Sequence, residues 1–323
     1  MSRNTLWNRR ELALGAGALG IGLMLGDRGW AATAPKGKAP PKKPAGIAVG
    51  YAAITWGDKS VKTAMEEIAA AGYPGIQLRK NILDEYKEPA ALKADLDRLK
   101  LTFACVSGGG PLADPAKRQE EVDKFMVLAK FAREAGALAI QATSPNRNGR
   151  PTIDPAELKA FAETLNEIGK RCTDLGFPLA FHPHMNQIGE KPDELEVILG
   201  AADPKHVKLL LDTGHWAAAG GDPVKAVKDH VKRIEVLHIK DVKDRSPAAG
   251  ALAKDGKPDT KKYEFVELGQ GKVDFKGVFK ALRGGGFRGW AVVELDSVPE
   301  GRAPKDAALA NRDFLTKNVG LKV

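Results

Sequence analysis

Short apolar runs alternate with amphipathic stretches from residue 47 to the end of the chain. This alternation predicts strands that are each followed by a helix, which is typical of a parallel sheet covered by helices. The eight apolar runs that we expect to be strands are Ile47–Tyr51, Gly75–Arg79, Leu101–Val106, Ala137–Ala142, Pro178–His182, Val207–Asp212, Ile234–Ile239 and Trp290–Leu295. Eight such units in about 250–280 residues predict an α/β fold, a closed (β/α)8 TIM barrel in a single domain.

Helical patterns lie between these strands. The expected helices occupy Pro115–Ala135, Asp154–Leu175, Asp222–Lys232, Asp274–Arg283 and Ala303–Asn318. The alternative fold is an open doubly wound sheet, but no glycine-rich nucleotide fingerprint follows the first strand. The triplet Gly108–Gly110 follows the third strand without phosphate-loop spacing, so it is interpreted as a tight turn.

A polar stretch, Val242–Val273, separates the seventh strand from its helix and is rich in Lys, Asp, Gly and Pro. Long loops inside compact domains are commonly functional or disordered. We interpret this stretch as an insertion over the barrel mouth that closes on the substrate. Under this hypothesis, removal of Pro247–Lys261 raises KM or lowers turnover, and unchanged kinetics contradict it.

The first 34 residues predict a twin-arginine signal peptide. The twin arginines lie in Asn8–Leu12, an uncharged apolar stretch follows to Gly26, and Ala32–Ala34 has the small-x-small pattern of a cleavage site. The apolar stretch is short for a span, which needs ~20 apolar residues. We therefore expect the twin-arginine export machinery as a partner, a periplasmic location and no stable membrane anchor. A buried helix or an uncleaved anchor is the alternative.

Residues 35–46 are a Pro/Lys-rich linker, and the catalytic domain is expected over 47–323. The net charge of the chain is +9, of which the first 34 residues carry +2 and the linker +4. The remaining +3 gives the body no basic footprint for nucleic acid, so we expect no such partner. Cys105 and Cys172 have no zinc-site spacing and are interpreted as buried free thiols, with pairing as the alternative.

Histidine is concentrated where strands end. Four of the six histidines lie at the ends of strands five to seven: His182, His184, His215 and His238. In a barrel of this class the active site is built at the C-terminal ends of the strands. These histidines are therefore candidates for the active site.

The spacing of one set of side chains matches the β/α repeat. His182 and Asp212 are 30 residues apart, and Asp212 and His238 are 26 apart. Glu294 follows His238 by 56 residues, which is one unit plus the insertion. Four adjacent strands would thus bring His182, Asp212, His238 and Glu294 to one level. Imidazole and carboxylate ligands suit one divalent ion of Mn²⁺, Co²⁺, Zn²⁺ or Mg²⁺. Unrelated polar residues at strand ends are the alternative.

A second set of polar side chains lies close to these. His184 and Lys240 share a strand face with the predicted ligands two residues before them, and His215 lies three residues after Asp212. We interpret this second set as substrate-binding. For Lys240, stabilisation of an oxyanion and a salt bridge with Asp241 or Glu294 are equal alternatives.

In these residues the chain resembles the xylose isomerase-like TIM-barrel superfamily of sugar isomerases and epimerases, and within it the inosose dehydratase-like branch. The resemblance is carried by Phe181-His182-Pro183-His184-Met185, Leu211-Asp212-Thr213-Gly214-His215, Gly221-Asp222, His238-Ile239-Lys240-Asp241-Val242, Gly269-Gln270-Gly271-Lys272-Val273-Asp274-Phe275, Gly289-Trp290 and Glu294. The match is strong over Phe177–Glu294 and weaker elsewhere in the body.

The resemblance implies metal ligands at Asp212, His238 and Glu294 and a substrate-binding His215. The fourth ligand is expected to be His182, with His184 and then Gln187 as alternatives and as substrate contacts. Two glutamates are used for epimerisation in this superfamily, and a histidine stands at one of these positions here.

The implied chemistry is proton abstraction next to a carbonyl with a metal-stabilised enediolate, with Glu294, His182 and Lys240 as catalytic candidates. The histidine favours a dehydration or hydration step on a keto-sugar, keto-glycoside or inosose. The alternatives are an isomerase or epimerase of free sugars and a non-catalytic sugar-binding barrel. The sequence predicts no oligomeric state.

Overall fold

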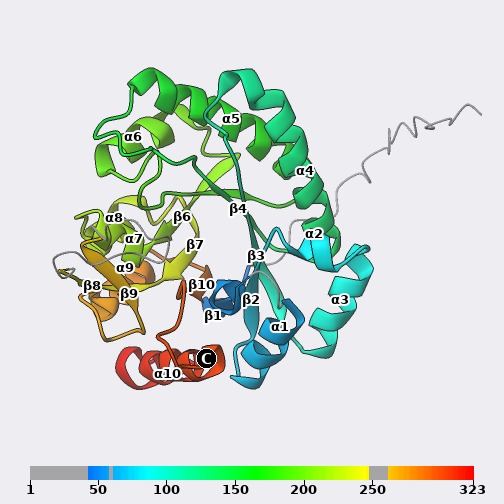
Figure 1. The fold of residues 1–323 in the computed structure, drawn as a ribbon, viewed down its shortest axis with the longest axis vertical. Coiled ribbons are helices and arrows are strands. Elements are labelled where there is room, and N and C mark those ends of the chain that lie inside the picture. Colours follow the sequence, from blue (N-terminus) through cyan, green and yellow to red (C-terminus); the bar gives the residue numbers. More distant parts are fainter. Residues whose placement is uncertain (1–42, 58–60, 247–260) are drawn as a thin grey trace, which may run out of the picture. The chain divides into compact units, whose positions relative to one another are not determined.

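Eight parallel strands close into a barrel at the centre of the computed structural model, which describes residues 43–57, 61–246 and 261–323. The strands follow the order β1-β10-β7-β6-β5-β4-β3-β2 around the barrel (Figure 1). They are β1 (Ile47–Ala52), β2 (Gly75–Arg79), β3 (Thr102–Gly109), β4 (Ile140–Thr143), β5 (Leu179–His182), β6 (Val207–Asp212), β7 (Ile234–Ile239) and β10 (Gly289–Val293). The predicted TIM barrel is confirmed.

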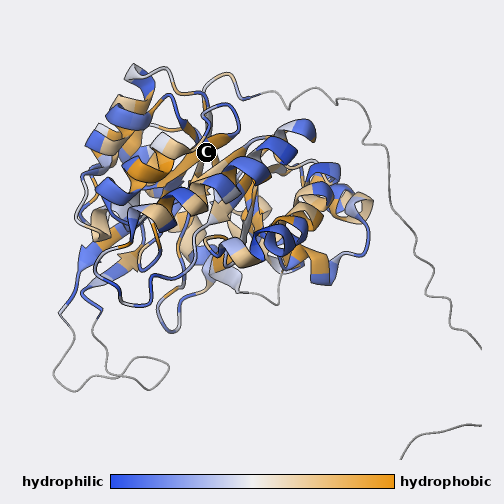
Figure 2. Cartoon of the chain, turned by 90° about the horizontal axis from the view of Figure 1, so that it is seen from above, coloured by the Kyte–Doolittle hydropathy of each residue, from blue (hydrophilic) through white to orange (hydrophobic). Residues whose placement is uncertain are grey.

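Helices surround the barrel, and in Figure 2 their apolar faces turn toward the strands. The α-helices are α1 (Val61–Ala70), α2 (Ile82–Glu85), α3 (Pro89–Arg98), α4 (Arg118–Glu134), α5 (Pro155–Asp174), α6 (Pro192–Ala201), α7 (Thr213–Ala218), α8 (Pro223–His230), α9 (Phe275–Gly284) and α10 (Pro304–Phe314). Short 3₁₀ or π turns occupy η1 (Ala53–Trp56), η2 (Pro115–Lys117) and η3 (Leu315–Val319). Within the described part of the chain, no helix is long and apolar enough to cross a membrane.

Three predicted features concern residues outside the described part of the chain. They are the signal peptide (1–34), most of the linker (35–46) and the middle of the insertion (247–260). The flanks of the insertion form an antiparallel ribbon of β8 (Asp241–Asp244) and β9 (Tyr263–Val266), which the polar pattern did not predict. Cys105 and Cys172 are buried and free, as expected.

The interpretation of Gly108–Gly110 as a tight turn is wrong, because β3 continues to Gly109 and pairs with β4 there. The glycines are needed for close packing rather than for a turn. A Cβ atom on Gly109 would lie 2.2 Å from Oγ1 of Thr143, and one on Gly108 would lie 2.9 Å from the Phe125 ring. Apolarity alone did not reveal that the strand extends through glycine.

Trp290 fills the barrel interior next to small residues. A Cβ atom on Gly75 would lie 2.1 Å from the indole ring, and one on Gly50 would lie 3.6 Å from it. The other interior side chains are Ala52, Ala104, Cys105, Ala139, Ala180, Leu210, Val236 and Val292. One large ring among mostly small side chains is a way to reach native packing density in a narrow barrel.

Asp241 fixes the segment that follows the ribbon. Its buried carboxylate accepts hydrogen bonds from the backbone amides of Gly269, Gly271, Val273 and Val242, at 2.8–3.1 Å. Gly269 has a φ of +86°, and a Cβ atom on Gly271 would lie 2.2 Å from Oδ1 of Asp241. The loop thus wraps around this one side chain.

Replacing Asp241 by Ala is expected to lower the free energy of unfolding by about 2–3 kcal/mol, because buried amides lose a charged acceptor. Urea denaturation measures this loss. Asp244→Ala is the matched control, since the Asp244 side chain is 79% exposed and its change should be within ~0.5 kcal/mol. Equal effects of the two substitutions would contradict the role of Asp241.

Candidate metal centre at the barrel mouth

Strand register brings the four predicted ligands to one end of the barrel. Asp212, at the end of β6, is level with His238 of β7, and His238 is level with Val292 of β10. Glu294 follows β10 directly, and His182 is the last residue of β5. All four side chains are at least nine-tenths buried. The repeat spacing therefore places these four residues together, as the sequence predicted.

Asp212 both ends β6 and caps the helix after it. Its Oδ1 accepts hydrogen bonds from the backbone amides of Gly214 and His215, both at 2.8 Å. The cap fixes the carboxylate, so that Oδ2 is held in the barrel mouth. Thr213 joins the ends of β6 and β7, because its hydroxyl donates to the Lys240 carbonyl and accepts from the Lys240 amide.

Three buried polar atoms of the described residues in this cluster have no hydrogen-bond partner: Nδ1 of His182, Oδ2 of Asp212 and Nδ1 of His238. Buried polar atoms normally have partners, and leaving one without costs about 1–3 kcal/mol. All three are ligand atoms for a divalent cation. The chemistry and position of these atoms fit a metal ion.

The distances between these ligand atoms also fit a metal ion. Nδ1 of His238 lies 3.3 Å from Oδ2 of Asp212 and 3.4 Å from Oε2 of Glu294, without hydrogen-bond geometry to either. Two ligands that each lie about 2.0–2.1 Å from one ion are roughly 3.4 Å apart at a tetrahedral angle. These two distances are those expected between ligand atoms of a common ion.

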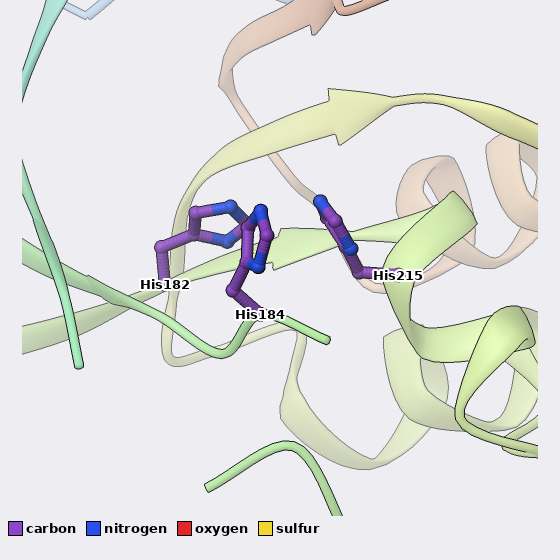
Figure 3. Close-up of side chains that lie close together, drawn as sticks. All are labelled: His182, His184 and His215. Atoms are coloured by element: carbon purple, nitrogen blue, oxygen red, sulfur yellow. The ribbon is translucent and has the colours of Figure 1, made fainter. Parts of the chain in front are cut away.

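Proximity alone defines two groups in the described residues, and neither of them contains His238. One combines His182, Asp212 and Glu294 with His215, and the other contains three histidines, His182, His184 and His215 (Figure 3). However, Nε2 of His215 lies 3.1 Å from the Lys240 ammonium, which accounts for this atom. The orphaned Nδ1 of His238 makes His238 the better ligand candidate.

Lys240 is completely buried, with its ammonium beside two carboxylates. It donates to Oε1 of Glu294 at 2.8 Å and to Oδ1 of Asp296 at 2.7 Å. Of the two expected salt-bridge partners, Glu294 is correct and Asp241 is wrong, because the Asp241 carboxylate binds backbone amides. Gly214 leaves room for this arrangement, since a Cβ atom there would lie 2.5 Å from Cγ of Lys240.

Burial and neighbouring charges set the ionisation of the centre. Burial would raise the pKa of the Glu294 and Asp212 carboxyls, but His238 and then Lys240 lower the pKa of Glu294 to about 2, and Lys240 above all holds the pKa of Asp212 well below its usual range. For Lys240, burial would lower the pKa, and the carboxylates of Asp296 and Glu294 raise it. Burial also holds the pKa values of His182 and His215 well below 6.5. Neutral imidazoles and ionised carboxylates are the forms that bind metal.

These histidine shifts predict an acid-sensitive metal-free protein. The folded state keeps His182 and His215 neutral, whereas the unfolded chain binds protons below pH 6.5, so stability is full above pH 6.5 and is lost as the pH falls. As the pH falls from 6.5 toward 5, we expect the loss of unfolding free energy to approach about 1.4 kcal/mol per pH unit for each histidine. Urea denaturation in chelator at several pH values measures the slope.

The matched variants for this slope are His215→Gln and His206→Gln, since His206 lies outside the barrel mouth beside Thr173. The first should flatten the pH dependence and the second should not. A wild-type stability that is unchanged between pH 7.5 and 5.5 would contradict the assignment of neutral buried histidines.

A cavity of about 340 Å³ opens beside the centre. It is bordered on one side by His182, His184 and Glu294, and Gln187 also lines it. The opposite wall consists of residues that the sequence analysis missed: Ile54, Gln77, Arg79, Lys80, Ser107, the glycines 108–110, Gln141 and Thr143. A second cavity, of about 470 Å³, lies at the other end of the barrel with a mainly apolar lining.

The ribbon of β8 and β9 reaches the centre through Phe265. The Phe265 ring lies edge-on to His215 at 4.6 Å between centroids, and the Lys240 ammonium is 4.5 Å from its centre. Tyr263, two residues earlier, contacts Asn186 in the loop after β5. The sequence placed this polar stretch near the mouth, but it gave no sign that Phe265 packs on the His215 ring and the Lys240 ammonium.

These observations define a (β/α)8 barrel whose mouth holds a buried cluster of His182, Asp212, His238 and Glu294 that is a candidate metal centre. The xylose isomerase-like TIM barrel family matches residues 65–318, and the chain belongs to this family. The inosose dehydratase of Geobacillus thermodenitrificans is 27% identical over 298 residues, which cover 85% of this chain and 98% of the relative. The rhizopine catabolism protein MocC of Rhizobium meliloti is 30% identical over 286 residues, 82% and 86% of the two chains.

Solved structures share the fold at low sequence identity. The IolI protein with a binding zinc atom has a TM-score of 0.68 at 20% identity and covers 84% of this chain and 98% of its own. The probable 3-DHS dehydratase AsbF of Bacillus anthracis has a TM-score of 0.68 at 18% identity, with 84% and 99% covered. At these identities the likeness shows the fold alone.

Proposed function

We propose that this protein is a metal-dependent dehydratase of a keto-polyol of the inosose type or a closely related keto-sugar. The observation that carries the proposal is the set of orphaned ligand atoms on His182, Asp212 and His238, with Glu294 beside them. The likeness to inosose dehydratases over more than four-fifths of the chain supports the substrate class. The cavity beside the centre is lined by amide, hydroxyl and imidazole groups, which suit a polyhydroxylated ligand.

The proposed ligands are His182, Asp212, His238 and Glu294. A divalent cation held there supplies a Lewis acid that polarises a carbonyl and acidifies the neighbouring C–H group. Nitrogen and oxygen donors without thiolate fit Zn²⁺, Mn²⁺ or Co²⁺, and Mg²⁺ less well because two of the donors are imidazoles.

His184 is the proposed base. Its Nδ1 lies 2.8 Å from the Met185 carbonyl, which can only accept, so Nδ1 carries the hydrogen and Nε2 keeps a lone pair. Burial and the Lys240 charge lower the pKa of His184, which keeps the ring neutral at neutral pH. A neutral imidazole at the cavity wall can take the proton beside the carbonyl.

Lys240 and His184 have different proposed roles in the loss of water. The proton taken by His184 can be returned to the departing β-hydroxyl, so that a C–H and a C–O bond break, a C=C bond forms and water leaves. The Lys240 ammonium is held charged by Glu294 and Asp296, so it favours negative charge near the centre without giving up a proton.

Incubation of metal-loaded protein with inososes and keto-glycosides tests the function. The expected result is loss of water with an unsaturated ketone, seen by ultraviolet absorption and NMR, and its abolition by His184→Gln but not by His206→Gln. In D₂O, deuterium in a rearranged sugar without loss of water would instead indicate an isomerase. Ligand binding without any metal-dependent turnover would indicate a sugar-binding barrel.

Periplasmic export is a separate proposal, supported by the twin arginines and the cleavage-site pattern of residues 1–34. Cell fractionation should find the protein in the periplasm. Replacing Arg9 and Arg10 by Lys should retain it in the cytoplasm, and an unchanged location would contradict the proposal.

A further inference from the structure

Two glutamines connect the metal centre to the opposite wall of the cavity. Gln77 of β2 and Gln141 of β4 are 2% and 4% exposed inside the barrel. Nε2 of His238 lies 2.9 Å from Oε1 of Gln77, and Nε2 of Gln77 donates to Oε1 of Gln141 at 3.0 Å. The chain His238–Gln77–Gln141 thus crosses the barrel from β7 to β4.

The direction in which hydrogen bonds are donated along this chain follows from the proposal that Nδ1 of His238 is the ligand atom. If Nδ1 of His238 gives its lone pair to a cation, the ring hydrogen of the neutral imidazole must be on Nε2. Nε2–H then donates to Oε1 of Gln77, whose amide group donates to Oε1 of Gln141. The remaining polar atom of Gln141 is its Nε2, with two hydrogens, and Gln141 lines the cavity.

The other tautomer would reverse every link. With hydrogen on Nδ1, Nε2 of His238 would accept from the Gln77 amide group, and Gln141 would turn its carbonyl oxygen to the cavity. The two arrangements therefore present opposite hydrogen-bonding groups to a ligand. Coordination at Nδ1 selects the donor arrangement.

We propose that Gln77 is a positioning residue for the metal ligand His238 and that Gln141 is a substrate-binding residue whose amide donor is oriented through it. The group that Gln141 recognises is a hydrogen-bond acceptor, such as a carbonyl or hydroxyl oxygen of the ligand. This inference rests on the proposed function for its substrate arm, whereas its metal arm stands on the geometry of the centre alone.

Three variants separate the two roles. Gln77→Leu removes the acceptor for Nε2–H of His238, and loss of such an outer partner weakens metal binding by about 10–100-fold. Gln77→Glu keeps an acceptor but removes the donor to Gln141, so metal affinity should remain within about threefold while KM rises roughly tenfold. Gln141→Leu should leave metal affinity unchanged and raise KM by about tenfold or more, the loss expected for one substrate hydrogen bond.

The experiment measures Zn²⁺ affinity by competition with a chromophoric chelator, without substrate, and then KM and kcat on metal-saturated protein. Thermal melting of each metal-free variant checks folding. Wild-type Zn²⁺ affinity in Gln77→Leu, or a loss in Gln77→Glu equal to that in Gln77→Leu, would overturn the positioning role. Gln141→Leu with an unchanged KM would overturn the binding role. If the wild type shows no dehydration at all, the proposed function fails, and the Zn²⁺ measurements still decide the role of Gln77.

Discussion

Asp212→Asn is expected to lose the bound metal and the activity while the fold is retained. The asparagine oxygen can still cap α7 through the amides of Gly214 and His215, so the helix start should survive. The group that replaces Oδ2 is an NH₂, which offers no lone pair to a cation. Metal content should fall from about one equivalent to none, and affinity should fall by more than the roughly 100-fold that outer partners contribute.

Asp222→Asn is the matched control for this substitution. Asp222 caps α8 through the Val224 amide, but it is exposed and its carboxylate has no orphaned buried atom. Elemental analysis after dialysis measures the metal content of both variants, and denaturation compares their stability. Full metal occupancy in Asp212→Asn would refute the proposed ligand set, whatever the activity.

The barrel and its ligand set were predictable because each depends on a pattern that repeats along the chain. Strands buried on both faces read as continuous apolar runs, and eight of them occurred at β/α spacing. The ends of parallel strands meet at one end of a barrel, so His182, Asp212 and His238 could be placed at one level from spacing alone. The same reasoning placed Glu294 near the end of the predicted strand Trp290–Leu295, whereas β10 ends one residue before it, at Val293.

The opposite wall of the cavity was not predicted because its residues look unremarkable in the sequence. Gln77 and Gln141 are single polar residues inside apolar strand runs, and a buried amide in such a position needs partners. The need of a buried amide for hydrogen-bond partners was the signal in the sequence that could have revealed these residues. The partners of Gln77, however, come from strands that are not adjacent to β2 in the barrel, and no local sequence pattern specifies which strands meet.

The role of Phe265 and the second carboxylate partner of Lys240, Asp296, were not predicted from the sequence, whereas its partner Glu294 was among the expected ones. Phe265 is an isolated ring in a polar stretch, and only the pairing of β8 with β9 sets it against His215. Asp241 directly follows Lys240, but strand geometry turns neighbouring side chains to opposite faces. The second carboxylate partner of Lys240 is Asp296, which lies in the segment after β10, two residues beyond Glu294.

Replacing Lys240 by Met is expected to be the most destabilising of these changes. Met has a similar length and no charge, so the substitution leaves Glu294 and Asp212 as buried carboxylates without their ammonium neighbour. Breaking a buried ion pair by removing one partner costs about 3–5 kcal/mol. The loss should appear in urea denaturation of the metal-free protein near neutral pH, together with a large loss of turnover.

Lys272→Met is the control, because its salt bridge with Asp244 joins side chains that are 47% and 79% exposed and should contribute less than ~1 kcal/mol. A saturating divalent cation should restore part of the stability of Lys240→Met, since it returns positive charge between Asp212 and Glu294 and binds only the folded protein. The gain in stability on adding the cation should be larger for Lys240→Met than for the wild type, and it should be the same for Lys272→Met as for the wild type. If the metal stabilises both variants equally, or if Lys240→Met costs no more than the control, then the buried ammonium does not balance the carboxylates of this centre.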